Sequence, residues 1–143
     1  MRRLLLAALP LLVAGCTIPG QGLVGPAPQR PSQATAQDIA AQADRVPLVT
    51  IGATAGPDEY QSALAQAVRQ AQALKPDVMF DVLSAVPRKG TPTKQTLAAK
   101  ALTPDATEVA QAIMGDGVPV ERITLGAVIV PGIPGDEVRV YVR

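Results

Sequence analysis

Apolar residues recur along residues 46–143 with two different spacings, one typical of strands and the other of helices. Short runs rich in β-branched side chains predict strands over residues 48–51, 78–83 and 122–130. In the last segment of the chain apolar and polar positions alternate, which predicts a strand that turns its valines toward the core. The inward set is Val138, Val140 and Val142, and the outward set is Arg139, Tyr141 and Arg143.

One segment between these strands carries apolar residues every three or four positions, which predicts a helix with one buried face. It is expected to begin at Gly56-Pro57-Asp58-Glu59, where a proline and two acids suit the first turn. Lys75-Pro76 is expected to end it. Its apolar stripe comprises Leu64, Ala67, Val68, Ala71 and Leu74.

A second long helix is expected over residues 105–114, with Thr103 as its N-cap and Pro104 in its first turn. Its apolar stripe comprises Val109, Ala110, Ile113 and Met114. Shorter helices are predicted over residues 38–45 and 94–101.

The order strand–helix–strand–helix–strand–strand predicts an α/β fold, a two-layer sandwich on a mixed sheet. Strand–helix–strand units favour parallel strands joined by right-handed connections. The short link at residues 131–135 suits an antiparallel neighbour for the last strand. In the strand over residues 78–83 one face is apolar, whereas the other places Asp81 beside Met79 and Leu83. Because that second face is mixed, helices are expected to cover only one face of the sheet.

The first 16 residues have a pattern of their own, a short apolar run behind two positive charges. Arg2 and Arg3 precede residues 4–14, which at about 11 residues are too few for the roughly 20 that a spanning helix needs. The run has no polar face, which excludes an amphipathic helix, and it predicts a cleaved signal peptide. The single cysteine of the chain ends this segment in the run Leu12-Val13-Ala14-Gly15-Cys16.

That run resembles the lipobox of bacterial lipoprotein precursors. The resemblance implies cleavage between Gly15 and Cys16, a lipid on the Cys16 sulfur and an acylated amino terminus. Several acyl chains anchor a protein stably, since each buried methylene contributes about 0.8 kcal/mol. Thr17 stands where an aspartate often directs retention at the inner membrane, and it favours the outer membrane with the folded part facing the periplasm. The alternative is an ordinary signal peptide in which Cys16 is incidental.

Proline and glycine are frequent over residues 17–37, which predicts an extended tether that buries little apolar surface. The expected organisation is a signal peptide over residues 1–15, the lipidated cysteine with its tether over residues 16–45, and one folded domain over residues 46–143.

Composition narrows the chemistry that such a domain can perform. The chain has no histidine and only 2 tyrosines and 1 phenylalanine, which removes the commonest general base and metal ligand. Without Arg2 and Arg3 it has 11 basic and 12 acidic residues, a net charge of −1, which gives no reason to expect nucleic acid. No glycine-rich phosphate loop follows a strand, and no acidic cluster has metal-ligand spacing. We therefore expect no catalytic residues, no metal and no cofactor.

The C-terminal residues carry a family resemblance. Gly117-Val118, Glu121-Arg122-Ile123 and the alternating final strand are similar to the second half of OmpA-like domains. The resemblance implies a fold that binds peptidoglycan through an aspartate after the second strand and an arginine in the second helix. This chain has residues 84–88, Ser-Ala-Val-Pro-Arg, at the first place and Asp105 at the second. The fold is therefore expected, and no ligand residue is carried over.

Two surfaces are candidates for contact with a partner. The first is a group of four cations with no acid between Asp81 and Asp105; its members are Arg88, Lys89, Lys94 and Lys100. They suit anionic lipid, wall polymer or an acidic protein, or they form a solvated loop that only keeps the protein soluble. The second is the mixed sheet face, where Met79 and Leu83 either form an apolar patch for a protein or lie beneath residues 38–45.

These observations predict a non-catalytic cell-envelope lipoprotein, a tethered OmpA-like binding module for peptidoglycan or a periplasmic protein. The alternative is a structural lipoprotein subunit of a trans-envelope pilus or secretion complex. In both cases the lipid anchor holds the chain at the membrane.

Overall fold

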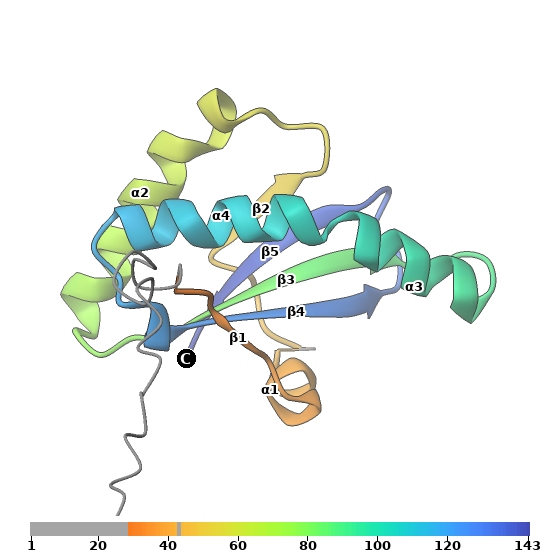
Figure 1. The fold of residues 1–143 in the computed structure, drawn as a ribbon, viewed down its shortest axis with the longest axis horizontal. Coiled ribbons are helices and arrows are strands. Elements are labelled where there is room, and N and C mark those ends of the chain that lie inside the picture. Colours follow the sequence, from red (N-terminus) through yellow and green to blue (C-terminus); the bar gives the residue numbers. More distant parts are fainter. Residues whose placement is uncertain (1–28, 43) are drawn as a thin grey trace, which may run out of the picture.

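Five strands form one mixed sheet in the computed structural model, which describes residues 29–42 and 44–143 (Figure 1). The strands are β1 (Ser32–Gln33), β2 (Val49–Gly52), β3 (Phe80–Pro87), β4 (Ile123–Val130) and β5 (Glu137–Val142). They lie side by side in the order β1-β4-β3-β5-β2. β4 is parallel to β1 and β3, whereas β5 is antiparallel to β3 and β2.

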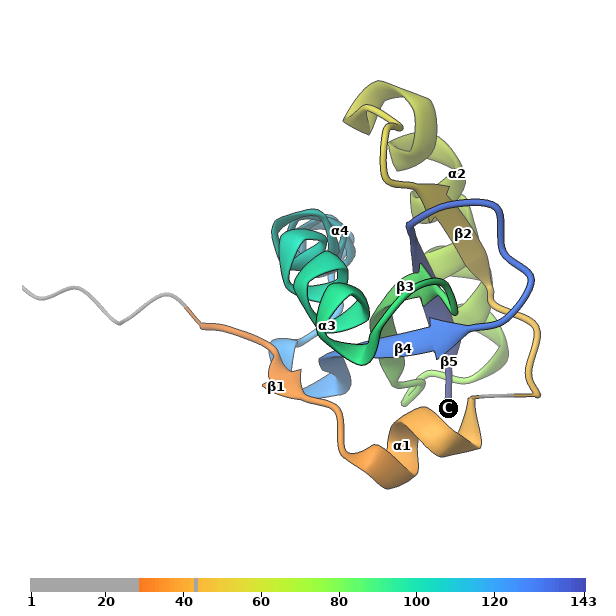
Figure 2. The ribbon, with the colours of Figure 1, turned by 90° about the vertical axis from the view of Figure 1, so that its right-hand side faces the viewer.

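Three helices pack on one face of the sheet and form the second layer of the fold (Figure 2). They are α2 (Pro57–Leu74), α3 (Pro92–Ala101) and α4 (Thr103–Gly115). The core lies between α2, α4 and the alternate apolar side chains of the strands. Its most deeply buried members are Leu64, Val68, Phe80, Val82, Val86, Val109, Ala110, Ile113, Ile123, Val138 and Val140. The predicted two-layer α/β sandwich on a mixed sheet is confirmed.

The ends of α2 agree with the local sequence signals, whereas the start of α4 is changed by the neighbouring helix α3. α2 begins after Gly56 and ends before Lys75, as predicted, but Leu74 at its last position is 90% exposed instead of buried. The prediction that Thr103 caps α4 is wrong. α3 runs into α4 with Leu102 as their only joint, and the Thr103 hydroxyl donates to the Ala99 carbonyl oxygen at 3.3 Å. Because α3 directly precedes α4, the Thr103 side chain bonds to the last turn of α3 instead of capping α4.

The last strand does not take the position that its short connection suggested. β5 lies between β3 and β2, and the link from Val130 to Glu137 passes the end of β3. The predicted pairing of the last two strands is therefore wrong, although β5 is antiparallel to β3. The side chains of β5 explain why it lies inside the sheet and not at its edge: Val140 on one face and Tyr141 on the other are both buried.

A short helix, α1 (Ala36–Ala41), lies against the other face of the sheet (Figure 2). It starts two residues before the predicted helix because Thr35 and Asp38 form a capping box: the Asp38 amide donates to the Thr35 hydroxyl at 3.1 Å, and the Thr35 amide donates to the Asp38 carboxylate at 2.9 Å. With β1 before it, this helix places the start of the folded part well before Val46, inside the stretch expected to be tether.

Candidate functional site

The four predicted cations all lie at the end of the molecule that α3 forms. Arg88 and Lys89 stand between β3 and α3, and Lys94 and Lys100 lie on α3 itself. All four are exposed, and none takes part in the ion pairs formed among residues 29–42 and 44–143. The structure therefore places the members of this predicted surface at one end of the domain and pairs none of them with an acid of the described residues.

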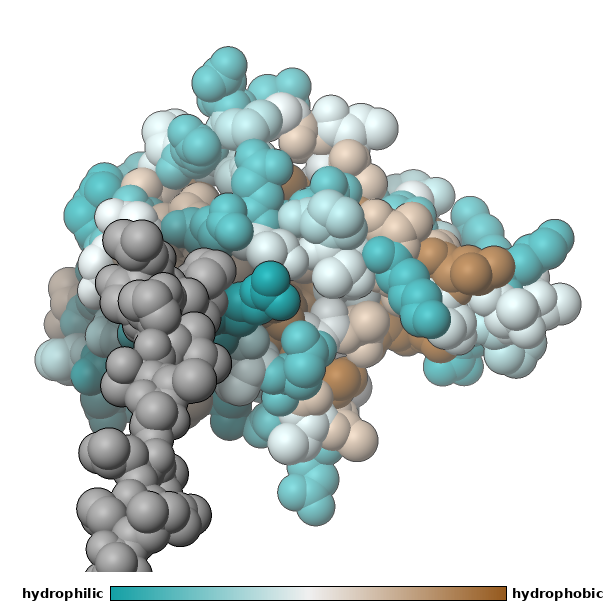
Figure 3. All heavy atoms as spheres, in the orientation of Figure 1, coloured by the Kyte–Doolittle hydropathy of each residue, from teal (hydrophilic) through white to brown (hydrophobic). Residues whose placement is uncertain are grey.

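α3 is itself unusually exposed for a helix of this length, because none of its residues is buried. It is held at its start by the Thr91 hydroxyl, which accepts from the Lys94 amide at 3.4 Å, and by Gly90, whose φ of 76° turns the chain into the helix. Leu97 on its outer side is 60% exposed. Figure 3 shows apolar surface at this end of the molecule, bordered by hydrophilic side chains. The helix predicted over residues 94–101 is confirmed and begins at Pro92.

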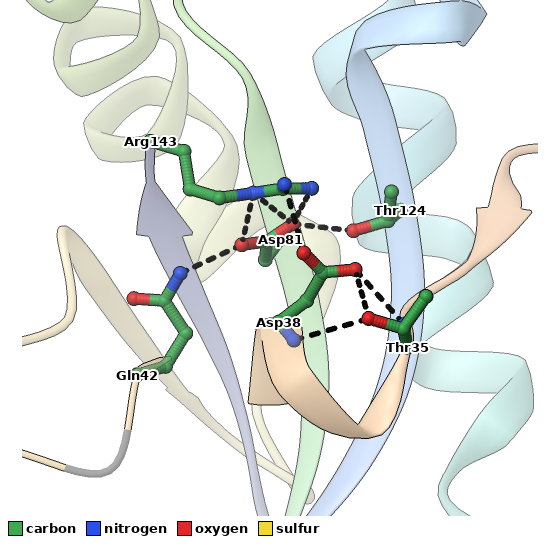
Figure 4. Close-up of polar contacts among 6 residues, drawn as sticks. All are labelled: Thr35, Asp38, Gln42, Asp81, Thr124 and Arg143. Atoms are coloured by element: carbon green, nitrogen blue, oxygen red, sulfur yellow. Dashed lines mark hydrogen bonds and ion pairs between the residues drawn. The ribbon is translucent and has the colours of Figure 1, made fainter. Parts of the chain in front are cut away.

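The second group of charges lies on the opposite face of the sheet, around the buried carboxylate of Asp81 (Figure 4). The Arg143 guanidinium approaches its two oxygens at 2.9 and 3.0 Å, and the Gln42 amide donates to it at 2.7 Å. The Thr124 hydroxyl also donates to this carboxylate. Asp81 thus receives donors from β4, from the end of the chain and from the segment after α1.

Arg143 connects this cluster to α1. Its guanidinium donates to the Asp38 carboxylate at 2.9 Å, so that one cation bridges the sheet and the helix. Hydrogen bonds from the Thr35 backbone and side chain, followed by the charge of Arg143, lower the pKa of Asp38 below its usual value. Asp38 therefore stays ionised at neutral pH and keeps both its capping role and its ion pair.

This face of the sheet is covered, so the predicted apolar patch at Met79 and Leu83 is not exposed as a whole. Leu83 is 1% exposed and Tyr141 is 3% exposed, so the prediction that Tyr141 points outward into solvent is wrong. A Cβ placed on Gly126 would lie 2.9 Å from Leu83 Cδ2 and 3.1 Å from Ala34 Cβ, which shows how closely the N-terminal segment lies on the sheet. The alternative, in which residues near 38–45 cover this face, is the correct one, and the cover starts at Ala34.

Sequence reasoning missed the Asp81 cluster, although both of its main members carried a signal. Asp81 is the one acid in a strand of otherwise uncharged residues, and Arg143 alternates with valines in the last strand. Each was interpreted within its own strand. Their pairing depends on the antiparallel register of β3 and β5, which places Tyr141 opposite Asp81 and Arg143 beside Met79.

The two places where OmpA-like domains carry their ligand residues have a different chemistry here. The strand predicted over residues 78–83 is β3 and runs from Phe80 to Pro87, so Ser84 is buried within it and the exposed Arg88 is the first residue after it. Asp105 lies at the start of α4 beside a cavity of about 40 Å³ that Tyr60 and Glu108 also line. The Tyr60 hydroxyl donates to Glu108 at 3.5 Å, and burial, followed by the Glu108 charge, raises the pKa of Tyr60. An anionic group has no cation to meet at this place.

The remaining predicted features lie outside the described residues or concern absences within them. Gly15 and Cys16, with the signal peptide, fall in residues 1–28, of which the structure describes nothing. Within residues 29–42 and 44–143, no three metal-ligating side chains come together. In that same part of the chain, no helix has both the length and the apolar character needed to cross a bilayer.

Comparison with models of known protein families and with curated protein sequences gives no match for this chain.

Proposed function

We propose that this chain is a non-catalytic, lipid-anchored protein of the bacterial cell envelope whose α/β domain binds another periplasmic protein. The observation that supports this most strongly is the α3 end of the domain. Four cations stand there without acidic partners among the described residues, beside the exposed side chain of Leu97. A surface that joins positive charge to exposed apolar area suits a protein partner better than solvent alone.

The anchor in this proposal depends on the run Leu12-Val13-Ala14-Gly15-Cys16 and its resemblance to a lipobox. The first described element, β1, begins only 16 residues after Cys16 at Ser32. At the roughly 3.1 Å per residue of a proline-rich linker, a stretch of that length spans about 50 Å. The domain therefore acts close to the membrane that holds the lipid, at the outer membrane in this proposal.

Between the two ligands of the OmpA-like interpretation, a protein is favoured over peptidoglycan. The family holds the wall peptide with an aspartate after the second strand and an arginine in the second helix, and this chain has Arg88 directly after β3 and Asp105 at the start of α4. A negatively charged group on the wall peptide meets Asp105 and Glu108 there, which repel it.

Two measurements test the proposal. Intact mass spectrometry of the native protein is expected to show a chain that starts at Cys16 with acyl chains attached, and the Cys16→Ser variant is expected to keep its first fifteen residues. Purified sacculi are expected not to retain the protein at low salt. An unmodified thiol on a full-length chain contradicts the anchor, and firm retention on sacculi contradicts the preference for a protein partner.

A second candidate, a structural subunit of a trans-envelope pilus or secretion complex, is favoured by one observation. Ile129 on β4 is 42% exposed and is one of four large apolar side chains that the described residues expose, with Val46, Leu74 and Leu97. A permanent subunit is expected to crosslink to its neighbours at fixed stoichiometry, whereas a binding module exchanges. A chain that remains monomeric and without partners after crosslinking of intact envelopes contradicts this second candidate.

A further inference from the structure

β4 is paired along its whole length on one side and along only two residues on the other. On the inner side Ile123 to Val130 match Phe80 to Pro87 of β3. On the outer side only Thr124 and Leu125 have strand partners, which are the two residues of β1. The N-terminal segment then leaves the edge, after the Ala34 amide donates to the Leu125 carbonyl oxygen at 2.6 Å. From residue 126 to residue 130, no strand among the described residues covers the outer edge of β4.

The direction of the backbone groups along this open edge follows from the pairs already formed. Leu125 turns its carbonyl toward β1, whereas Val130 accepts a bond from the Arg88 amide on the β3 side at 3.1 Å. Because neighbouring residues of a strand turn their polar groups to opposite edges, Ala127 and Ile129 direct both N–H and C=O outward. Two donors and two acceptors therefore stand in a row without a partner among the described residues, which is the arrangement that accepts an added strand.

The side chains next to this edge are apolar and exposed. Ala127 is exposed and Ile129 is 42% exposed. α3 lies beside the same end of β4 and contacts it, as both ribbon views show (Figures 1 and 2). An added strand therefore has the exposed side chains of Ala127 and Ile129 to pack against as well as backbone groups to pair with.

The charge around this edge selects the partner. Arg88 is hydrogen-bonded through its backbone to the last residue of β4, and Lys89, Lys94 and Lys100 continue the positive charge along the loop and α3. No acid occurs in residues 82–104. A second copy of this chain joined edge to edge would bring two such groups of cations together, which disfavours self-pairing. An acidic segment gains attraction at the same place.

We propose that the outer edge of β4 over residues 126–130 takes a short, extended, acidic segment of a partner protein as an added strand. Its backbone pairs with Ala127 and Ile129, its apolar side chains pack beside the exposed Ile129, and its acids meet the cations of the loop and α3. The inference deepens the proposed function, because it names the surface and the chemistry of the partner, and the contact itself is tested without the anchor.

The experiment uses the purified full chain in detergent micelles and a nine-residue synthetic peptide of alternating glutamate and valine. The matched peptide alternates lysine and valine. Amide exchange is measured residue by residue. The glutamate peptide is expected to slow exchange at Ala127 and Ile129 and to leave other amides unchanged, whereas the lysine peptide has no effect. The protection is expected to weaken as salt is raised.

Three variants separate the parts of the contact. Ile129→Pro removes an outward N–H that no described residue uses and is expected to abolish the protection at Ala127, whereas Ile129→Thr, which keeps the N–H, retains most of it. Lys94→Glu with Lys100→Glu is expected to weaken peptide binding by roughly threefold to tenfold. Lys75→Glu, an exposed cation at the end of α2, is the matched control and is expected to change nothing.

Four results overturn the proposal. Equal effects of the two peptides remove the charge argument, and protection elsewhere removes the edge. Protection at Ala127 and Ile129 that grows with protein concentration alone identifies a second copy as the occupant. Vesicles of phosphatidylglycerol and phosphatidylcholine that shield α3 while the peptides have no effect identify a lipid surface. A native protein that carries no acyl chains in the mass measurement contradicts the anchor but does not change these peptide results. Failure of the anchor and failure of the edge contact are therefore distinguishable.

Discussion

The two short helices of this domain differ in what their charged residues do. Neither α1 nor α3 contains a buried residue, so neither is held mainly by its own apolar face. α1 lies against the sheet because Asp38 and the following Gln42 meet Arg143 and the buried Asp81. On α3, by contrast, Lys94 and Lys100 meet no acid among the described residues. Charge at α1 therefore connects the helix to the sheet, whereas the charges of α3 form no ion pair with any described residue.

The largest expected effect comes from removing the centre of the α1 contact. Asp81→Ala leaves the Arg143 guanidinium and the Gln42 amide without their shared acceptor, and Asp81 is fully buried. Breaking a buried pair in this way costs about 3–5 kcal/mol, and we expect a loss of that size in urea denaturation. The control is Asp77→Ala, an exposed acid next to the same strand, for which a change under about 0.5 kcal/mol is expected. Equal losses in both variants contradict the role of the cluster.

The next largest effect is expected where the N-terminal segment before α1 packs against the sheet. Gly126→Ala places a Cβ at 2.9 Å from Leu83 and 3.1 Å from Ala34, so the N-terminal segment must move away from the sheet. Overpacking of this kind costs about 1–3 kcal/mol, and we expect faster amide exchange in residues 34–41. Gly115→Ala is the matched change, since nothing lies within 4 Å of its Cβ. Unchanged exchange in α1 of the Gly126 variant contradicts the close contact.

A smaller effect is expected when Asp38 is neutralised by acid. Its pKa is lowered in the folded protein, so its contribution is present above the unfolded value near 4 and is lost as pH falls through the folded value. Amides of α1 are therefore expected to lose protection below about pH 4, whereas amides of α3 show no such pH dependence. Thr35→Ala, which removes the cap, is expected to cost about 1 kcal/mol and to weaken this pH dependence.

The smallest effect on stability is expected at α3. Lys94→Glu and Lys100→Glu change exposed side chains without ion-pair partners in the described part of the chain, so the free energy of unfolding is expected to stay within about 0.5 kcal/mol of the parent. Thermal and urea unfolding measure this. A loss of more than about 2 kcal/mol would mean that these lysines maintain the fold, and the contrast between the two helices would then disappear.

The sequence pattern predicted most of the fold because its signals are local. Pro57 after Gly56, the stripe from Leu64 to Ala71, and the alternating valines of β5 each specify an element from a few neighbouring residues. The order of the strands was less accessible, since the place of β5 between two other strands depends on the burial of both its faces, with Val140 on one and Tyr141 on the other. The cover over the second sheet face was one of two alternatives, and its start at Ala34 was not predicted, because the capping box of Thr35 lies in a stretch whose prolines favour a tether.

The candidate site likewise has one part that the local sequence predicted and another that depends on how the strands pair. The four cations were found from the absence of acids around them, and the structure places them at one end of the domain. The open edge of β4 could not be predicted, because it depends on β1 covering two residues and no more. Asp81 and Arg143 meet only through strand register, which no local pattern fixes.

The most direct test compares two exposed leucines at opposite ends of the molecule, Leu97 on α3 and Leu74 at the end of α2, which are 60% and 90% exposed. A photo-crosslinking amino acid replaces each in turn, in intact cells, with and without Lys94→Glu and Lys100→Glu. We predict a discrete protein adduct from position 97 that the charge reversal removes, and none from position 74. Equal adducts from both positions, or an adduct at position 97 that survives the charge reversal, would contradict a partner surface at α3.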